Sequence, residues 1–325
     1  MPKILVTGGA GYIGSNTAHR LRKRGFDVLI IDDLSRGHER NTVGFPFCKL
    51  NTADTKELIP LLRDVDAVVH FAAYISVGES TEKPEIYFAN NVSGTLGLLN
   101  AMIEAKVRRL VFSSTAAVYG LPEESPISEE APFAAVNPYG ESKVMVEKIL
   151  GWLDQYRGLR SIVLRYFNAC GADPETGLGE EHEPETHLIP LLFRAIETGQ
   201  PVTIFGDDYP TPDGTCIRDY IHVADLAEAH VVALESLLAG GKSDAFNVGT
   251  GTGHSVIEVV RAVEEATGKP VPRKMGPRRQ GDPPALVANS NKLRQTLGWK
   301  PQYGDLRYIV ETAWRFEQEH RRQPA

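Results

Sequence analysis

Tyr139 and Lys143 are the residues whose types and spacing most directly indicate chemistry. They lie four positions apart in the run Pro138-Tyr-Gly-Glu-Ser-Lys143, so a helix would carry both side chains on one face. A free phenol, with a pKa of about 10, is a poor base near neutral pH. An adjacent ammonium group stabilises the phenolate, which would allow Tyr139 to take up and return a proton. The same spacing also fits an exposed pair on a helix surface.

Hydroxyl side chains close a predicted strand upstream of this pair. The run Ser113-Ser-Thr115 lies at the end of the apolar segment Leu110–Ser114. In a parallel doubly wound sheet, the carboxyl ends of the strands line the crevice that binds a cofactor. We therefore expect a hydroxyl group of this run to lie beside Tyr139, which favours a reactive pair over an exposed one.

A glycine-rich loop follows the first predicted strand, Ile4–Thr7. Gly8, Gly11 and Gly14 have the spacing G-x-x-G-x-x-G and stand at the start of a predicted helix. Without side chains, such a turn lets a pyrophosphate approach the amides of the helix N-terminus, where the dipole favours negative charge. The strand, the glycines and the helix together predict a dinucleotide site.

Asp32 ends the second predicted strand, 24 positions after Gly8. A carboxylate there accepts hydrogen bonds from a ribose and repels a 2′-phosphate, so we expect NAD rather than NADP. The structural alternative is a carboxylate that only caps the next turn. Nearby Arg36 is the one feature that weighs toward NADP.

Strand-length apolar runs alternate with amphipathic segments over residues 1–170, which predicts an α/β fold with a Rossmann-type doubly wound parallel sheet. Residues 171–325 lose this rhythm and predict a smaller, mixed α/β domain for the substrate, some of whose segments return to pack on the first. The predicted strands are Ile4–Thr7, Val28–Asp32, Ala67–Ala73, Leu110–Ser114, Ile162–Tyr166, Val202–Phe205 and Ala245–Val248. The helices predicted after residue 170 are Ile189–Thr198, Val223–Leu238, Ser255–Thr267 and Leu306–His320.

Composition narrows the classes of function. The 35 Lys and Arg against 42 Asp and Glu give a net charge of −7, which argues against a general nucleic-acid binder. The first strand leaves no room for a signal peptide and no run reaches the roughly 20 apolar residues of a membrane span, so we expect a cytoplasmic protein. Cys48, Cys170 and Cys216 lack paired spacing and the nine histidines form no zinc motif, so no metal is expected.

Short motifs spread over nearly the whole chain carry a resemblance to a known family. They are Gly8-Gly-Ala-Gly-Tyr-Ile-Gly14, His70-Phe-Ala72, Val77-Gly-Glu-Ser80, Asn90-Asn-Val92, Ser113-Ser-Thr115, Val118-Tyr-Gly120, Tyr139-x-x-x-Lys143, Leu164-Arg-Tyr-Phe-Asn168, Phe205-Gly-Asp-Asp-Tyr-Pro-Thr211 and Arg218-Asp-Tyr-Ile-His-Val223. With these motifs the chain resembles the extended short-chain dehydrogenase/reductases and, within them, the UDP-glucose 4-epimerase (UDP-galactose 4-epimerase) family.

The resemblance implies a reversible redox reaction at carbon 4 of a UDP-hexose. Tyr139 would take the proton of the 4-hydroxyl while hydride passes to NAD, and the 4-keto sugar would turn over before hydride returns to its other face. Lys143 would bind the nicotinamide ribose and, with the positive ring, lower the pKa of Tyr139. Thr115 would hold the sugar hydroxyl and the ketone oxygen, replacing the family's more frequent serine.

The resemblance also implies the contacts of NAD. Two of these positions depart from the best-known members, because Asn51 replaces an aspartate that meets the adenine and Ile75 replaces a frequent lysine. The implied NAD residues are Gly8, Gly11, Tyr12, Ile13, Gly14, Asp32, Asp33, Leu34, Ser35, Arg36, Gly37, Asn51, Thr52, Phe71, Ala72, Ala73, Tyr74, Ile75, Asn90, Thr115, Tyr139, Lys143 and Phe167.

The substrate residues are implied in the same way. A UDP group carries about two negative charges, so an acidic protein needs converging arginines, and Arg218 and Arg279 match the family's diphosphate ligands. The alternatives are a structural ion pair for Arg218, a solvated charge for Arg279 and a surface histidine for His187, which replaces an asparagine. The implied substrate residues are Thr115, Tyr139, Asn168, His187, Leu188, Thr203, Ile204, Phe205, Arg218, Arg279 and Leu286.

Several alternatives depend on single positions. Leu286 replaces a bulky tyrosine, so UDP-N-acetylhexosamines are a second candidate substrate. Ala116 and Ala117 stand where related 4,6-dehydratases carry an acid and a base, which argues against dehydration. A UDP-glucuronate or UDP-pentose 4-epimerase stays open, as does a non-catalytic NAD-sensing protein, although such proteins often lose the tyrosine. The family also implies a homodimer that pairs the helices 85–105 and 139–155 of two subunits.

Overall fold

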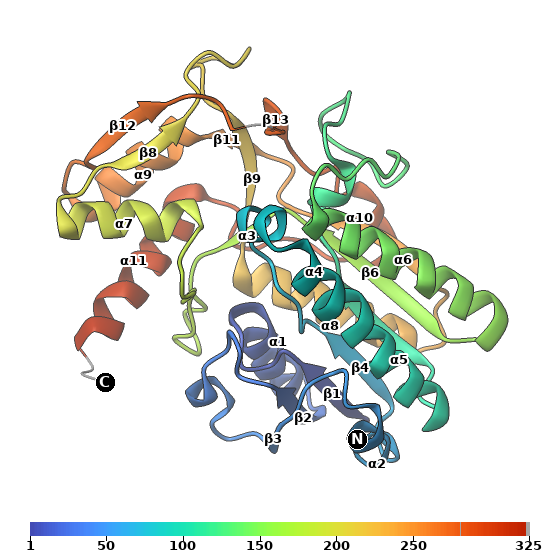
Figure 1. The fold of residues 1–325 in the computed structure, drawn as a ribbon. Helices are drawn as coiled ribbons and strands as arrows, with labels where there is room; N and C mark the ends of the chain where they lie inside the picture. Colours follow the sequence, from blue (N-terminus) through green and yellow to red (C-terminus); the bar gives the residue numbers. More distant parts are fainter. Residues whose placement is uncertain (280, 323–325) are drawn as a thin grey trace.

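Seven parallel strands form the central sheet of this computed structural model, which describes residues 1–279 and 281–322 (Figure 1). The order β10-β6-β5-β4-β1-β2-β3 reverses direction between β1 and β4, where a doubly wound sheet opens its crevice. The predicted Rossmann-type sheet is thereby confirmed. The strands are β1 (Lys3–Thr7), β2 (Asp27–Asp32), β3 (Phe47–Lys49), β4 (Ala67–His70), β5 (Arg109–Ser113), β6 (Arg160–Tyr166) and β10 (Asp244–Val248).

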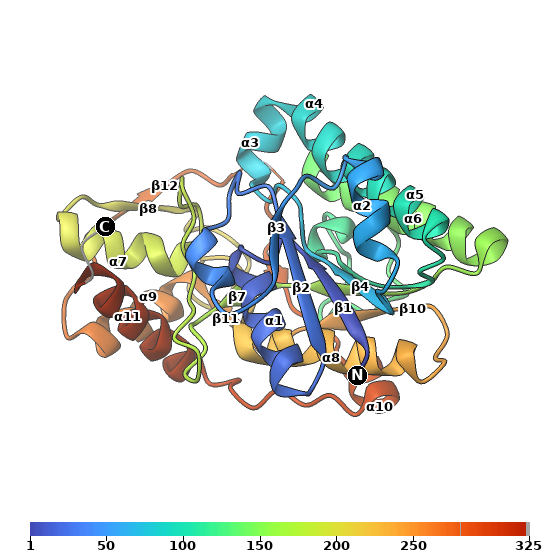
Figure 2. The same cartoon turned by 90° about the horizontal axis from the view of Figure 1, so that it is seen from below.

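Helices cover both faces of this sheet (Figure 2). Ile4 and Val6 of β1 face one core with α1 (Tyr12–Lys23), α8 (Val223–Leu238) and α10 (Asn291–Leu297). Leu5, between them, faces a second core with α2 (Thr55–Leu62), α5 (Thr95–Glu104) and α6 (Pro138–Arg157). Because successive side chains of a strand point to opposite faces, an uninterrupted apolar run suits a strand covered on both sides.

One strand from late in the chain completes the sheet. β10 pairs with β6 in parallel, with Phe246 opposite Leu164, and α8 packs beside α1. The division of the chain at residue 170 remains a prediction, and residues 323–325 of the predicted second domain lie outside the described part. β4 ends at His70, so Phe71 to Ala73, which we expected in the strand, lie in the loop that follows it.

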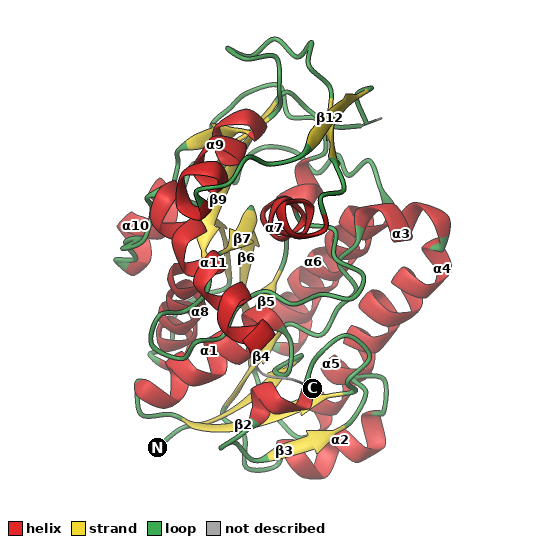
Figure 3. Cartoon of the chain, turned by 90° about the vertical axis from the view of Figure 1, so that its left-hand side faces the viewer, coloured by secondary structure: helices red, strands yellow, loops and turns green. Residues whose placement is uncertain are grey.

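Short strands and helices form a second region beside the central sheet (Figure 3). β9 (Ile217–His222) is its centre: β11 (Gly253–Ser255) lies along it antiparallel, and β7 (Asn168–Cys170) and β13 (Ala285–Leu286) pair with it in parallel. β8 (Val202–Phe205) pairs separately with β12 (Arg273–Gly276). The helices α7 (Leu188–Thr198), α9 (Val256–Thr267) and α11 (Leu306–Arg322) pack around a third core.

Short elements complete the chain between these layers. They are η1 (Glu39–Thr42), α3 (Val77–Glu82), α4 (Pro84–Tyr87), the π-helix η2 (Phe88–Gly94) and η3 (Ala116–Tyr119). Within residues 1–279 and 281–322, none of the helices is both long and apolar enough to cross a membrane.

Candidate active site

The glycine loop has the close approaches that require glycine. Gly8 has a φ of +68°, and a Cβ there would lie 2.6 Å from the amide nitrogen of Ala72. A Cβ on Gly14 would lie 2.2 Å from the carbonyl oxygen of Gly8. Gly11 is the N-cap of α1 and has no side chain to occupy the helix terminus, so the first amides of α1 are left for an anion. This cradle fits the pyrophosphate of a dinucleotide.

Asp32 both holds this loop and keeps accepting capacity. Its carboxylate is buried and accepts hydrogen bonds from the amides of Ala10 at 3.0 Å and Leu34 at 2.8 Å. Burial raises the pKa of Asp32, and the two amides oppose that shift. The turn cap that we considered as an alternative is therefore present. It does not exclude a ribose ligand, because each carboxylate oxygen has a second lone pair.

Two neighbouring side chains are already paired in the protein. Arg36 makes two hydrogen bonds with Glu79, at 3.0 and 2.9 Å, which compensates the charge that weighed toward NADP. Asn51 donates to Asp33 at 2.7 Å, and its amide oxygen accepts from the backbone at 2.9 Å. Asn51 thus ties Asp33, the residue directly after β2, to the turn at Ala53.

The loop after β4, which carries the predicted NAD residues 71–75, is tied to α6 through Asn91. The buried Asn91 amide accepts from the Tyr74 amide at 2.8 Å and donates to the Tyr74 carbonyl at 3.0 Å and the Ser142 hydroxyl at 3.1 Å. Asn90 donates to Asn91 at 3.0 Å. The sequence analysis gave Asn91 no role, although it stands in the motif Asn90-Asn-Val92.

Tyr139 and Lys143 are buried in the first turns of α6. The helix begins here because Asn137 accepts from the amide of Gly140 at 2.8 Å and Pro138 occupies the first helical position. Lys143 donates to the carbonyl of Ser113 at 2.9 Å, at the end of β5. The pair is therefore inside the protein at the carboxyl edge of the sheet, and not on an exposed helix face.

Burial controls the protonation of this pair in the protein alone. It raises the pKa of Tyr139, against the opposing hydrogen bond from Thr115. It lowers the pKa of Lys143 to about 7, although the nearby Glu147 carboxylate acts in the other direction. Lys143 is not among the groups that shift the pKa of Tyr139, so the lowering that we expected from it is not seen in the protein alone. The positive nicotinamide ring, the other source that we expected, would act only with NAD bound.

Thr115 lies two residues after the end of β5 and caps η3. Its hydroxyl oxygen accepts from the amide of Ala117 at 3.1 Å, which fixes the turn that presents it to Tyr139. Beneath this strand end is a buried ion pair that the sequence analysis missed. Glu147 lies 2.7 Å from Arg165 and accepts from the Ser114 hydroxyl at 2.5 Å.

Asp282 brings the two predicted diphosphate arginines together. Arg279 donates to one carboxylate oxygen at 2.9 Å, and Arg218 lies 3.5 Å from the other. Arg218 also donates to the carbonyls of Ile217 at 2.8 Å and Pro283 at 3.0 Å, and the Arg279 guanidinium lies 5.1 Å from the centre of the Phe205 ring. The ion-pair alternative for Arg218 therefore holds in the protein alone. The guanidinium groups of Arg218 and Arg279 also converge on one point, as the binding of a diphosphate would require.

Packing connects these arginines to α6, which carries Tyr139 and Lys143. Leu286 pairs with Arg218 in the sheet and packs against the apolar cluster that contains Ala116, Val144 and Phe167. Adjacent to Phe167, the Asn168 side chain donates to the carbonyl of Asp219 on β9 at 3.1 Å. The substrate candidates and the reactive pair thus share one wall.

The remaining substrate candidates lie in the second region. Ile204 is buried in its core, so only its backbone is available to a ligand, while Phe205 is exposed. His187 and Leu188 stand at the N-terminus of α7 and border a cavity of about 50 Å³. We expected no metal from the sequence, yet Glu180, His182 and Glu185 lie together with His187 in one cluster beside this cavity.

A larger hollow lies at the opposite edge of the central sheet. It measures about 520 Å³ and is lined by residues that precede or begin strands, among them Asp66, Lys106, Arg160 and Gly241. These positions mark the amino ends of the strands, whereas ligands of doubly wound sheets bind at the carboxyl ends. The hollow is therefore separate from the site described here.

Comparison with known proteins identifies the family. The model of the NAD dependent epimerase/dehydratase family matches residues 4–249. The UDP-glucose 4-epimerase of Lactobacillus helveticus is 48% identical over 322 residues, which cover 98% of both chains. The solved UDP-glucose 4-epimerase of Brucella ovis, in complex with NAD, is 44% identical with a TM-score of 0.94 and covers 97% of this chain and 98% of its own. That of Bifidobacterium longum, with NAD+ and UDP, is 37% identical with a TM-score of 0.91 and covers 98% and 99%. The chain belongs to the NAD dependent epimerase/dehydratase family and, within it, to the UDP-glucose 4-epimerases.

Proposed function

We propose that the protein interconverts UDP-galactose and UDP-glucose through a transient 4-keto sugar and bound NAD. The observation that carries this function is the buried group of Thr115, Tyr139 and Lys143 at the carboxyl edge of the sheet that also carries the glycine loop. Ala116 and Ala117 supply no acid or base for dehydration. The names of the relatives favour a plain UDP-hexose over the UDP-glucuronate or UDP-pentose alternative.

Each reactive side chain has a defined task in this function. Tyr139 removes the proton of the sugar 4-hydroxyl and returns it, and Thr115 donates a hydrogen bond to the oxygen at that carbon. Lys143 binds the nicotinamide ribose. NAD supplies the reversible hydride acceptor when bound, so it is regenerated in each turnover. Because Tyr139 is buried and its pKa is raised, proton transfer depends on positive charge close to the phenol.

The two ligands occupy opposite sides of the reactive pair in this proposal. The glycine loop, Asp32 and the tethered loop 71–75 bind NAD. Arg218 and Arg279 bind the diphosphate of the substrate, for which they exchange part of their interaction with Asp282.

UDP-N-acetylhexosamines are a second candidate substrate, and Leu286 is the observation that favours them. Leu286 lies in the wall formed with Ala116 and Phe167, where a tyrosine would fill more of the space beside the sugar. Comparable turnover of UDP-N-acetylgalactosamine and UDP-galactose would support this candidate. Complete inactivity on UDP-N-acetylgalactosamine would remove it.

We also propose a cytoplasmic homodimer. On α6, Met145, Trp152 and Tyr156 are 39%, 61% and 69% exposed, and the rings of Trp152 and Tyr156 stack with centroids 5.8 Å apart. A stripe of large apolar side chains on a helix surface favours a subunit contact. Free thiols at all three cysteines favour a reducing compartment. Light scattering should give twice the chain mass, and Trp152→Lys with Tyr156→Lys should give the monomer.

A direct product assay tests the proposed function. The protein is loaded with NAD, freed of excess cofactor and incubated separately with UDP-galactose, UDP-glucuronate and a UDP-pentose, and the epimers are then separated. We expect UDP-galactose to be converted fastest. Faster conversion of UDP-glucuronate or the pentose would favour the alternative, and no conversion of any sugar with NAD bound would contradict the epimerase.

A further inference from the structure

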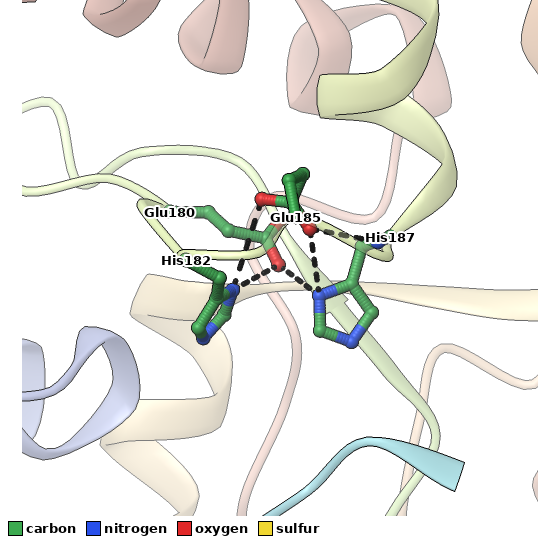
Figure 4. Close-up of side chains that lie close together, drawn as sticks. All are labelled: Glu180, His182, Glu185 and His187. Atoms are coloured by element: carbon green, nitrogen blue, oxygen red, sulfur yellow. Dashed lines mark hydrogen bonds and ion pairs between the residues drawn. The ribbon is translucent and has the colours of Figure 1, made fainter. Parts of the chain in front are cut away.

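Four side chains with metal-ligating atoms meet between β7 and α7. They are Glu180, His182, Glu185 and His187, and their ligand atoms all lie within 4.8 Å of one another. Figure 4 shows both carboxylates lying between the two imidazole rings. The Nδ1 atom of His187 is 2.5 Å from Glu180 and 3.5 Å from Glu185, and that of His182 is 3.3 Å from Glu180 and 3.8 Å from Glu185.

The atoms at the centre of this cluster are buried and joined by ion-pair contacts, but not by hydrogen bonds of good geometry. Oε1 of Glu180 and Nδ1 of both histidines have no hydrogen-bond partner of acceptable geometry within the described residues, despite their short separations. The side chains of Glu180 and Glu185 are only 7% and 12% exposed. The ring of His187 reaches solvent, but its Nδ1 atom does not. Buried polar groups without a well-formed hydrogen bond call for a partner that the protein does not supply, such as a bound ion.

We propose that these four side chains bind one divalent cation of the zinc class. Zinc takes four nitrogen or oxygen ligands at about 2.0–2.2 Å, which places neighbouring ligand atoms of a tetrahedron about 3.3–3.6 Å apart. Three of the four separations lie close to that spacing, although the two to Glu185 involve different oxygens of its carboxylate. The contact between His187 and Glu180 would open by about 1 Å. Two imidazoles select zinc-like ions over magnesium or calcium, which prefer oxygen ligands.

The alternative is a metal-free network of charged histidines and carboxylates. The two carboxylates raise the pKa of His182 to about 9 and that of His187 to about 10, and the histidines hold the pKa of Glu185 well below its usual range. A cation at the centre would replace those protons, so the two accounts differ in their prediction for metal uptake. Metal binding would also weaken as the pH falls, because protons compete with the metal for the imidazole nitrogens.

The position of the cluster indicates what the cation would hold in place. His187 is the N-cap of α7, and Glu180 and His187 border the small cavity with Asn168 and Leu188. The His182 ring meets the Tyr12 ring of α1 edge to face, with centroids 6.3 Å apart. A bound cation would therefore fix the chain between β7 and α7 against the helix that begins at the glycine loop. This inference does not depend on the proposed epimerase, and it gives His187 a task other than the substrate contact that the resemblance implies.

Metal uptake by the full chain tests this site. Tag-free protein, stripped with a chelator, is titrated with Zn²⁺ in a calorimeter, and bound metal is measured by elemental analysis. We expect one zinc per chain, at least tenfold weaker binding in His182→Gln and Glu185→Gln, and unchanged binding in the control His19→Gln. His19 is a histidine of α1 that contacts Phe45 and lies outside the cluster.

A second measurement on the parent protein covers the case in which a variant does not fold. Co²⁺ bound by two imidazoles and two carboxylates in a tetrahedron gives strong visible absorption, which zinc should abolish by displacement. Stripped parent protein that takes up neither Zn²⁺ nor Co²⁺ would overturn the proposal, as would folded variants that bind zinc as tightly as the parent. Epimerase activity is not a readout here, so failure of the two proposals can be told apart.

Discussion

Glu147→Gln is expected to destabilise the protein strongly. Glu147 and Arg165 form an ion pair whose side chains are only 5% and 7% exposed, and Glu147 receives three hydrogen bonds from Arg165 and one from Ser114. The substitution leaves Arg165 without its counter-charge in the interior, which typically costs about 3–5 kcal/mol. It also removes the negative charge that supports the Lys143 ammonium, so the pKa of Lys143 should fall further below about 7.

Urea unfolding at neutral pH measures this cost. The control is Glu104→Gln, an exposed glutamate at the end of α5, which should change the free energy of unfolding by no more than about 0.5 kcal/mol. Arg165 keeps its hydrogen bonds to the Tyr119 hydroxyl and the Glu129 carbonyl in the variant, which favours the lower end of the range. A loss below 1 kcal/mol for Glu147→Gln would refute the reasoning that the charge is desolvated.

Three further predictions follow from the candidate site. Tyr139→Phe should lower kcat by about 10²–10⁴-fold while bound NAD is retained, and a rate within tenfold of Tyr156→Phe would remove Tyr139 as the proton-transfer group. Arg218→Met should raise KM for UDP-galactose by about 10–100-fold, because it removes one or two charge-assisted hydrogen bonds to the substrate. An unchanged KM would argue against a contact between Arg218 and the diphosphate. The pKa of Lys143 is lowered on folding, so the unfolded chain binds more protons between about pH 7 and pH 10 and stability rises with pH there. The free energy of unfolding should therefore increase more steeply with pH over that window in the parent than in Lys143→Met. The control Lys148→Met should follow the parent. Equal slopes in all three proteins would contradict the lowered pKa of Lys143.

The parts of the site that depend on local sequence could be predicted. The glycines of the loop lie within seven residues, and Tyr139 and Lys143 lie four residues apart on one helix. Local backbone geometry alone fixes how such neighbours are placed. The sheet could be predicted too, because buried strands and amphipathic helices have different periods. The long apolar run after Ala67 nevertheless predicted a strand that is three residues too long, because apolar residues continue into the partly buried loop that follows β4.

The parts that depend on contacts between distant segments could not be predicted. Asn91 bridges two elements, and Glu147 and Arg165 meet only because α6 packs on β6. In the same way, Asp282 serves both arginines of the candidate substrate site. The hydrophobic periodicity of the sequence does not predict such contacts between distant residues. The cluster around His182 has no standard ligand spacing, so the absence of a motif said nothing about the folded chain.

The fate of the hydrogen at carbon 4 tests the central claim most directly. UDP-galactose carrying deuterium at carbon 4 is incubated in ordinary water with NAD-loaded protein, and the isolated UDP-glucose is analysed by mass spectrometry and NMR. Because the hydride is removed to bound NAD and returned to the same carbon, we predict that the deuterium is retained at carbon 4 with inverted configuration. Loss of the deuterium to water during conversion would contradict the account.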